Sequence, residues 1–563
     1  MKLRESFFKG NYILFFITVI LGIAGTMITL LYAYLLQELL DIANRGNMND
    51  LKNILLFALA LFIGLFVVQM LMKRVRCAFV RRAMIQYKNL AFKIISNKNI
   101  TSFAKEKTSS YLSVLTNDAT YIEENYLYSL FEIIMLLFSF IGAVALMLWY
   151  NWIMTIVVIL SCVIPIMISL IFGNKMSKLE QSISSENESF MGVIKDLFGG
   201  FFVIKSFQAD NKAIELFENQ NSNLEKFKEK RKNTEGTITI ISAEVGSILQ
   251  IGIFVVGTIL SIKDLITIGV VIAFVQLMNN IMEPIQQLPA LFAKRKAAKS
   301  LVEKMENYST SNETEDGSID IENISQSIKF ENVNFSYDDN KKALDNINIE
   351  FETGKSYVIV GESGSGKSTL FRLLLKGYSN YQGNIFFDNN NLKDIRNNSL
   401  YNVLSIVQQD VFIFNSSVRN NITLFNDYEN DKVNQSIKLS GLEKFIEKKG
   451  LNFDVGENGV NLSGGERQRI SIARCLLKDT KVLLVDEATS ALDAETSYLI
   501  MNSILKLDDI TRIFITHDLD KEMMKKFDEI IVLKEGRIIE KGKYDELISN
   551  KDYFYSLLNA GVL

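Results

Sequence analysis

Residues 356–368 read SYVIVGESGSGKS, an apolar run that leads into a glycine-rich segment and then into an expected helix. The order G-x-x-x-x-G-K-S between a strand and a helix is typical of a phosphate-binding loop. Its glycines let backbone N–H groups close around phosphate oxygens, and the start of a helix favours negative charge. We expect Lys367 to reach the β- and γ-phosphates of a nucleotide and the Ser368 hydroxyl to ligate Mg²⁺.

Two further strand-like runs end in residues suited to phosphate chemistry. Residues 482–485 are apolar and are followed by Asp486 and Glu487. A carboxylate at a strand end beside a phosphate loop can hold Mg²⁺, and a second one can orient or deprotonate the attacking water. Residues 512–516 lead to His517, the only histidine in the chain, which excludes multi-histidine metal sites. Its position after the acidic pair favours a functional over a structural role.

The residues on either side of this loop show where its domain begins. From 328 to 563 strand-like and helix-like segments alternate, which is typical of an α/β domain with a largely parallel sheet. A polar, acidic stretch at 306–327 precedes it and is expected to be a linker. Three widely spaced cysteines make a disulfide framework or a zinc ribbon unfavourable. The net charge of −3 gives no electrostatic reason to expect nucleic acid as a partner.

The part of the chain before residue 306 has a different composition. The whole chain is 48% hydrophobic with a mean hydropathy of +0.15, although 22% of it is charged, which suggests an apolar part joined to a soluble part. A helix needs about 20 apolar residues to cross the hydrocarbon core of a membrane. Runs that meet this length are found at 12–38, 53–72, 127–150, 152–172, 237–262 and 264–288. We therefore expect a transmembrane domain of six helices over residues 1–305.

Basic residues predict how these spans are oriented. They gather at the N-terminus and in the stretches 73–82, 226–232 and 294–296, which follow the second, fourth and sixth runs. The positive-inside rule then places both termini of a multi-pass protein in the cytoplasm. Frequent Lys, Asn and Ile suggest a bacterial source, and hence the plasma (inner) membrane.

Two long stretches between the runs, 73–126 and 173–236, contain few helix breakers. We expect them to extend the membrane helices into the cytoplasm and to turn near 96–107 and 208–211, where they could touch a cytoplasmic domain. The predicted fold is therefore a membrane α-helical bundle of six spans with long cytoplasmic extensions, followed by an α/β P-loop ATPase domain.

The segment LSGGERQR at 462–469 resembles the signature motif of the ATP-binding-cassette (ABC) transporter superfamily. Further resemblances to that family are the D-loop at 490–493, the Q-loop residue Gln409, the adenine-stacking residue Tyr337 and the switch histidine at 516–518. The first half resembles the exporter branch, with LTND at 115–118 and further similarities at 268–269 and 284–285. Two departures, Gln408 in place of proline and Asp518 in place of arginine, affect no residue that carries chemistry in the family.

The resemblance implies that two such domains hold two ATP molecules between them, each between the phosphate loop of one chain and the signature motif of the other. Glu487 would act on water and His517 would sense the γ-phosphate. The implied Mg²⁺ ligands are Ser368, Gln409 and Asp486. The implied nucleotide contacts are Tyr337, Gly361, Ser363, Gly364, Gly366, Lys367, Ser368, Thr369, Gln409, Ser463, Gly464, Gly465 and Asp493.

The expected function is ATP-driven export of a peptide, drug-like or lipid substrate through a lipid membrane, by alternating access in a dimer. Both halves of the nucleotide site are intact, which favours a homodimer. An importer built on the same scaffold and an ATP-gated channel or regulator stay open as alternatives. Glu132, Glu244 and Glu283 are predicted at a similar depth near the inner membrane boundary. They could form a cavity for cationic peptides or drugs, or be solvated positions on the helix extensions.

Overall fold

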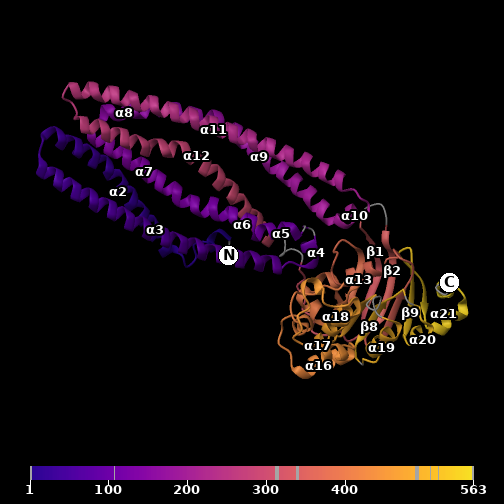
Figure 1. Ribbon diagram of the computed structural model, residues 1–563. Helices are drawn as coiled ribbons and strands as arrows, with labels where there is room; N and C mark the ends of the chain where they lie inside the picture. The colour runs from indigo at the N-terminus through magenta and orange to yellow at the C-terminus, as the bar shows by residue number, and fades with distance from the viewer. Residues whose placement is uncertain are drawn as a thin grey trace. The chain divides into compact units, whose positions relative to one another are not determined.

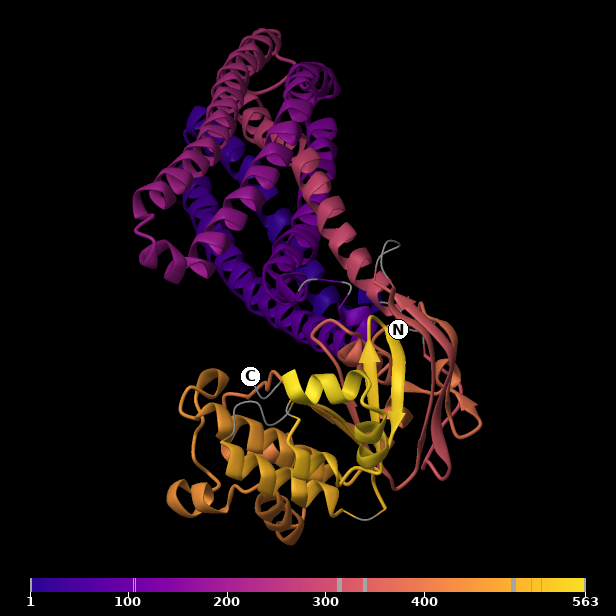
Figure 2. The same cartoon turned by 90° about the vertical axis from the view of Figure 1, so that its right-hand side faces the viewer.

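The computed structural model describes residues 3–104, 106, 108–310, 316–337, 342–487, 493–507, 509–517 and 519–560. The chain divides into two compact units. One is helical and consists of Met1–Ser96 with Thr108–Ser309, and the other is mixed and consists of Asn97–Lys107 with Thr310–Leu563. Figures 1 and 2 show long helices in the first unit and sheets covered by shorter helices in the second.

The helical unit is built from very long helices joined by short turns (Figure 1). Its elements in chain order are α1 (Leu3–Ser6), α2 (Tyr12–Arg45), α3 (Met48–Ser96), α5 (Thr108–Leu115), α6 (Asn117–Ile122), the π-helix η1 (Glu123–Tyr128), α7 (Ser129–Tyr150), α8 (Trp152–Ser161), α9 (Val163–Gly199), α10 (Phe201–Ser206), α11 (Asp210–Ile262) and α12 (Ile268–Thr310).

Five helical segments of the described residues are long and apolar enough to cross a membrane: Tyr12–Arg45, Met48–Ser96, Ser110–Tyr150, Asp210–Ile262 and Ile268–Glu306. Exposed apolar side chains such as Ile13 (76%) and Trp149 (86%) are what a lipid-facing surface requires.

The fourth predicted run, 152–172, is not one uninterrupted helix. It is divided at Cys162 between α8 and the start of α9. Pro165 stands in the first turn of α9 and has no N–H to donate to the carbonyl of Ser161, so the helical hydrogen bonding is interrupted at this point. Six continuous spans were predicted, and five helices of sufficient length and hydrophobicity are found among the described residues. The remaining apolar run is shared by α8 and α9.

An aromatic core joins α1, α3, η1 and α12. Phe7 is fully buried and stacks on Tyr87 at 5.7 Å between ring centroids. Arg295 of α12 lies 4.3 Å from the centroid of the Tyr126 ring and donates to the Tyr126 carbonyl. A π-helix interrupts the regular α-helical hydrogen-bond pattern, and the Arg295 side chain supplies a donor within this one.

The mixed unit contains a six-stranded sheet in the order β10-β9-β3-β8-β7-β6. The β3–β9, β3–β8, β8–β7 and β7–β6 pairs are parallel and only β9–β10 is antiparallel, as the α/β pattern predicted. Its strands are β3 (Ser356–Val360), β6 (Leu404–Val407), β7 (Val482–Asp486), β8 (Thr511–Ile515), β9 (Glu529–Lys534) and β10 (Arg537–Gly542). Every residue of β3 and β8 is buried, and both strands are apolar after their polar first residues, as expected for strands covered on both faces.

A second, antiparallel sheet has the order β2-β1-β4-β5. Its strands are β1 (Ser327–Ser336), β2 (Lys342–Glu352), β4 (Gln382–Phe387) and β5 (Asn390–Asn391). The helices of the unit are α4 (Ile100–Ala104), α13 (Lys367–Leu374), α14 (Asn397–Val403), α15 (Val418–Thr423), α16 (Asn430–Leu439), α17 (Glu443–Lys449), α18 (Gly464–Lys478), α19 (Ala494–Leu505), α20 (Lys521–Met524), α21 (Tyr544–Asn550) and α22 (Tyr553–Ala560). Two 3₁₀ turns, Leu392–Asp394 and Glu457–Gly459, complete it.

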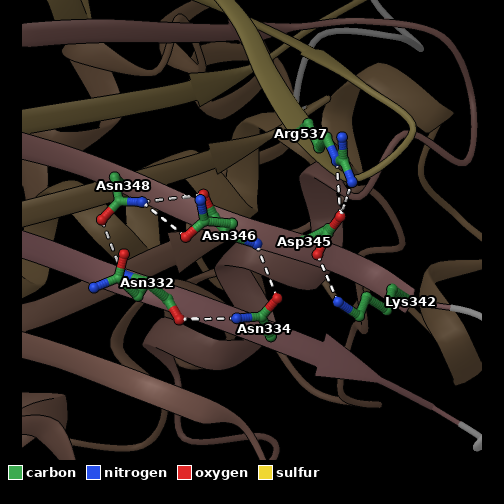
Figure 3. A network of polar contacts seen from close by, with 7 residues as sticks. All are labelled: Asn332, Asn334, Lys342, Asp345, Asn346, Asn348 and Arg537. Atoms are coloured by element: carbon green, nitrogen blue, oxygen red, sulfur yellow. Dashed lines mark hydrogen bonds and ion pairs between the residues drawn. The ribbon is translucent and has the colours of Figure 1, made fainter.

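Asparagines stabilise an irregular section of the β1–β2 pair (Figure 3). Asn332 and Asn346 have left-handed backbone conformations, with φ of 51° and 55°. The N–H of Asn332 donates to the Asn348 side-chain oxygen at 2.9 Å, and the N–H of Asn346 donates to that of Asn334 at 3.0 Å. These side chains satisfy backbone donors where the strand register shifts, so the sheet continues past the bulge.

Candidate active site

A cavity of about 1060 Å³ lies at the ends of the central strands of the parallel sheet. The phosphate loop follows β3, while Glu487 follows β7 and His517 lies beyond β8, and these three strands are neighbours. The carboxyl ends of adjacent parallel strands meet at one edge of a sheet, which is where ligands bind in such folds. The cavity is lined by Tyr337, Lys342, Ala343, Glu362, Ser363, Gly364, Ser365, Gly366, Lys367, Ser368, Thr369, Gln409, Glu487, His517, Lys534, Glu535 and Gly536.

Glycines allow the phosphate loop to pass close to neighbouring backbone. Gly361 has a φ of 152°, and a Cβ added there would lie 2.1 Å from the carbonyl oxygen of Leu533. Gly366 has a φ of 107°, and a Cβ there would lie 2.6 Å from the carbonyl oxygen of Ala343. Both approaches are too close for any other residue, so these two glycines are needed for the shape of the loop.

Lys367 is folded into the loop that it belongs to. Only 5% of it is exposed, and its Nζ donates to the carbonyl oxygens of Gly361 and Glu362, at 2.8 Å each. Burial lowers the pKa of Lys367, while the nearby Glu487 and Asp486 carboxylates act to raise it. The ammonium group is therefore held by the loop, near the Glu487 and Asp486 carboxylates.

Two of the predicted residues, Gln409 and His517, converge on the carboxylate of a third, Glu487. Gln409 Nε2 donates to Glu487 Oε2 at 2.8 Å, and His517 Nε2 lies 3.0 Å from Glu487 Oε1. Glu487 has a left-handed backbone with a φ of 49°, directly after the end of β7. A carboxylate held by two side chains in this way can orient a water molecule or accept its proton.

Asp486, at the end of β7, is a half-buried acid next to Glu487, although it is not among the described residues that line the cavity. Burial raises its pKa, and the adjacent Glu487 raises it further, while Arg372 and Lys367 act in the opposite direction. No cluster of three His, Cys, Asp or Glu side chains that could hold a metal was found in the described part of the chain. Mg²⁺ in nucleotide sites needs only one or two protein oxygens beside the phosphates, so Asp486, Ser368 and Gln409 fit this ion.

Tyr337 lines the cavity on the side of the antiparallel sheet. Its ring contacts Phe335 edge-on at 5.0 Å and Tyr378 at 5.4 Å, and its hydroxyl lies 2.9 Å from the Thr369 hydroxyl. The side chain is still 47% exposed. A fixed aromatic ring with this much accessible surface can stack on a base.

The signature segment, residues 462–469, does not line this cavity. Ser463 caps the N-terminus of α18 by accepting from the Glu466 N–H at 3.2 Å, and the Ser463 N–H donates back to Glu466 at 2.7 Å. Asp493 caps α19 by accepting from the Thr496 N–H at 2.9 Å. Neither Ser463, Gly464, Gly465 nor Asp493 is among the described residues that line the cavity. Residues 490–492 and Asp518 lie outside the described residues.

One wall of the cavity is formed by residues that no sequence motif predicted. The turn between β9 and β10 contributes Glu535 and Gly536, and the Gly536 N–H donates to the Ser365 carbonyl at 3.0 Å. Gly536 in turn accepts from the Asp345 N–H at 2.8 Å. No local pattern marks this turn as part of the site, because it reaches the loop only through the order of the strands.

An ion-pair network supports the same wall (Figure 3). Asp345 accepts from Lys342 at 2.7 Å and also pairs with Arg537 of β10. Both cations lower the pKa of the Asp345 carboxyl through hydrogen bonds. The network links the start of β2 to the β9–β10 turn, and Lys342 itself lines the cavity.

A second cavity, of about 340 Å³, is lined by the first of the two predicted turns. Ile100 of α4 lies there with Gln408, Phe412 and other residues of the mixed unit. The departure at Gln408 therefore belongs to this groove and is not part of the nucleotide cavity. In the helical unit, Glu132, Glu244 and Glu283 are all exposed.

Comparisons with known proteins show the family of both halves of the chain. A family model described as the ABC transporter transmembrane region matches residues 15–285, and one described as ABC transporter matches 344–490. An uncharacterized ABC transporter ATP-binding protein of Bacillus subtilis is 29% identical over 96% of this chain and 96% of its own. An ATP-dependent lipid A-core flippase of Pectobacterium atrosepticum is 30% identical over 83% of this chain and 81% of its own.

A solved structure also matches over nearly the whole chain. It is that of a bacterial Atm1-family ABC exporter with ATP bound, with a TM-score of 0.86 and 21% sequence identity. The match covers 97% of this chain and 98% of that one, so the two share their fold from the first helices to the last.

Proposed function

The chain belongs to the ABC transporter family as an exporter-type half-transporter, a multi-pass membrane ATPase, and from this premise we propose which residues drive it and what it carries. The observation that carries the proposal is the convergence of Gln409 and His517 on Glu487 in the cavity of the phosphate loop. Glu487 orients and deprotonates the attacking water, and His517 and Gln409 hold it in place.

The remaining site residues bind the nucleotide. Lys367 binds the β- and γ-phosphates together with the N–H groups of the loop, and Tyr337 stacks on the adenine. Ser368, Gln409 and Asp486 would hold Mg²⁺, which neutralises phosphate charge when bound. The signature residues Ser463, Gly464 and Gly465, with Asp493, complete the site of a second chain.

The experiment is the Glu487→Gln variant in lipid discs. We expect ATP to bind with nearly unchanged affinity while turnover falls about 10³-fold, because the base is lost but no phosphate contact is. Measuring ATP binding and phosphate release on the same preparation separates the two effects. A variant that keeps most of the wild-type ATPase rate would refute the role of Glu487.

Two copies of the chain form the working transporter. One chain places its signature residues outside its own phosphate-loop cavity, so a second chain must supply them. Around α10, the side chains of Phe198, Phe202 and Phe207 are 76–81% exposed, an apolar surface that a second copy would cover. We expect native mass spectrometry to give twice the mass of this chain; a complex of two different chains would contradict the homodimer.

The domain boundaries predicted from the sequence are part of this proposal. The proposed transmembrane domain is 1–305, the linker 306–327 and the ATP-binding domain 328–563. In the structure α12 continues to Thr310 and β1 begins at Ser327, so both ends of the proposed linker are in regular secondary structure. The protein is proposed to reside in the plasma (inner) membrane. Both of its termini would be cytoplasmic, because the positive-inside rule assigns the basic stretches to the cytoplasmic side.

The substrate is an amphiphilic molecule, namely a lipid, peptide or drug. The name of the Pectobacterium relative favours a lipid, and the exposed Glu132, Glu244 and Glu283 favour a positive charge on the substrate. Stimulation of ATPase activity in lipid discs by lipids, peptides and drugs would identify the class. If a variant with all three glutamates changed to glutamine treats cationic and neutral substrates as the wild type does, the preference for cations is wrong.

Uptake into inside-out vesicles tests the direction of transport. We expect ATP-dependent accumulation of the substrate inside them. ATP-dependent loss of substrate from preloaded inside-out vesicles would indicate an importer, and equilibration without accumulation would indicate a channel.

A further inference from the structure

The last described helix, α22, contacts the phosphate loop directly. The Tyr553 hydroxyl donates to Glu362 Oε1 at 2.5 Å. Glu362 is the second residue of the loop and lines the nucleotide cavity. The next residue, Phe554, is fully buried, and its N–H donates to Glu540 of β10 at 3.0 Å. The Tyr553 hydroxyl is therefore held in place by the core of the unit.

A lysine from β9 completes the contact. Lys534 Nζ lies 4.3 Å from the centroid of the Tyr553 ring, and Lys534 lines the same cavity. β9 lies directly beside the loop, because a Cβ added at Gly361 would lie 2.1 Å from the Leu533 carbonyl oxygen. Glu362, Lys534 and Tyr553 thus form one cluster at the edge of the loop.

The negative charge of Glu362 is unfavourable beside a triphosphate, so the position of its carboxylate affects ATP binding. A carboxylate that lines a site for a triphosphate repels the phosphate oxygens, and the repulsion grows as it approaches them. A short hydrogen bond to a carboxylate is stronger than one between neutral groups and fixes its orientation. Burial, and next the hydrogen bond to Glu362, raise the pKa of Tyr553 to about 12, so the hydroxyl keeps its proton at neutral pH.

We propose that Tyr553 is a positioning residue that holds the Glu362 carboxylate against α22 and thereby sets the affinity of the phosphate loop for ATP. The inference rests on the proposed nucleotide site and adds to it a residue from the other end of the domain. Tyr553 does not touch the reacting atoms in this assignment. Its loss therefore changes nucleotide binding and leaves the chemical step alone.

The test compares Tyr553→Phe with the wild type as full chains in lipid discs, using binding of Mg·ATP and steady-state ATPase kinetics. We expect the Kd and KM for ATP to rise about fivefold, with kcat changed by less than about twofold, because one charge-assisted hydrogen bond is lost. Tyr555→Phe is the matched control, since Tyr555 lies in the same helix and is 37% exposed. It should bind ATP as the wild type does.

A double-mutant cycle with Glu362→Gln separates positioning from a structural effect. Glutamine removes the charge, so we expect Glu362→Gln alone to bind ATP more tightly and Tyr553→Phe to have no further effect in that background. Unchanged ATP affinity in Tyr553→Phe, or the same loss in the Glu362→Gln background, would overturn the inference. If Tyr553→Phe does not fold, unaltered affinity in Glu362→Gln would overturn it too. ATP binding by Lys367→Ala with nearly wild-type affinity would instead refute the nucleotide site itself.

Discussion

The two halves of the nucleotide site differ in how they are completed. On the phosphate-loop side, residues from β3, β7, β8, the antiparallel sheet and the β9–β10 turn meet in one cavity within a single chain. On the signature side, Ser463 and Glu466 satisfy each other in a capping box, away from that cavity. The first half is assembled by the fold of one chain. The second is a preformed helix start that lacks a partner within its own chain's cavity, and this is the physical reason to expect two chains.

The largest effect should come from removing the charge on the phosphate-loop side. Lys367→Ala leaves the loop glycines in place but deletes its ammonium group, so we expect ATP affinity to fall about 100-fold or more and turnover to be lost. Equilibrium binding of ATP by the full chain measures this. Affinity within a factor of about three of the wild type would show that the two halves differ less than proposed.

Mixed dimers make the same comparison sharper. Gly465→Asp places a negative charge at the signature helix and should stop turnover while its own phosphate loop still binds ATP. Neither Gly465→Asp nor Lys367→Ala should hydrolyse ATP by itself. A mixture should recover part of the ATPase activity, because the loop of one chain meets the intact signature of the other. No recovery in purified mixed dimers would argue against a site shared between chains.

Asp486→Asn tests whether the phosphate-loop side is built for a cation. We expect turnover to fall about 100-fold as Mg²⁺ binding weakens, while the nucleotide-free protein melts a few degrees higher because a half-buried charge next to Glu487 is removed.

The pH dependence provides a further check on Asp486. Its pKa is raised in the folded chain, so the folded state binds this proton more tightly than the unfolded state does. Without nucleotide, the contribution of Asp486 to stability is present at low pH and is lost as the pH rises through the raised pKa. Asp486→Asn should lack this component in melting curves taken across acidic pH. An identical pH dependence in both proteins would show that Arg372 and Lys367 already offset the effects that raise the pKa of Asp486.

Tyr337 should have an intermediate effect. Tyr337→Leu removes the stacking ring, and we expect ATP affinity to fall about tenfold. Tyr337→Phe keeps the ring and loses only the contact with the Thr369 hydroxyl, so the loss should be about twofold. Titration with ATP and with inorganic triphosphate distinguishes the effects, since triphosphate has no base. Equal losses for both ligands would place Tyr337 outside the base site.

The smallest effect should be at the signature cap. Ser463→Ala removes the side-chain acceptor for the Glu466 N–H and should cost about 1 kcal/mol of helix stability. We expect a melting temperature a few degrees lower, with ATP binding to the phosphate loop of the same chain unchanged. Calorimetry and nucleotide binding test the two statements separately. Weaker ATP binding in an isolated chain would contradict the separation of the halves.

Much of the site could be read from the sequence because each motif depends on its own local chemistry. The glycines at 361 and 366 indicate close contacts between backbone segments, and the structure shows which carbonyl oxygens they approach. The spans were predictable from length and hydrophobicity, except that the fourth run is divided at Cys162. Pro165 marks that division in the sequence, but a count of apolar residues ignores it.

The sequence by itself determined the class of the protein, since a phosphate loop, an acidic strand end and long apolar runs each require only short-range order. Only the tertiary structure decided that Gln409 and His517 meet on Glu487, and that Tyr553 reaches Glu362 across 191 residues of chain. The physical reason is that hydrogen bonds between distant side chains follow from the order in which strands and helices pack, and no short stretch of sequence encodes that order.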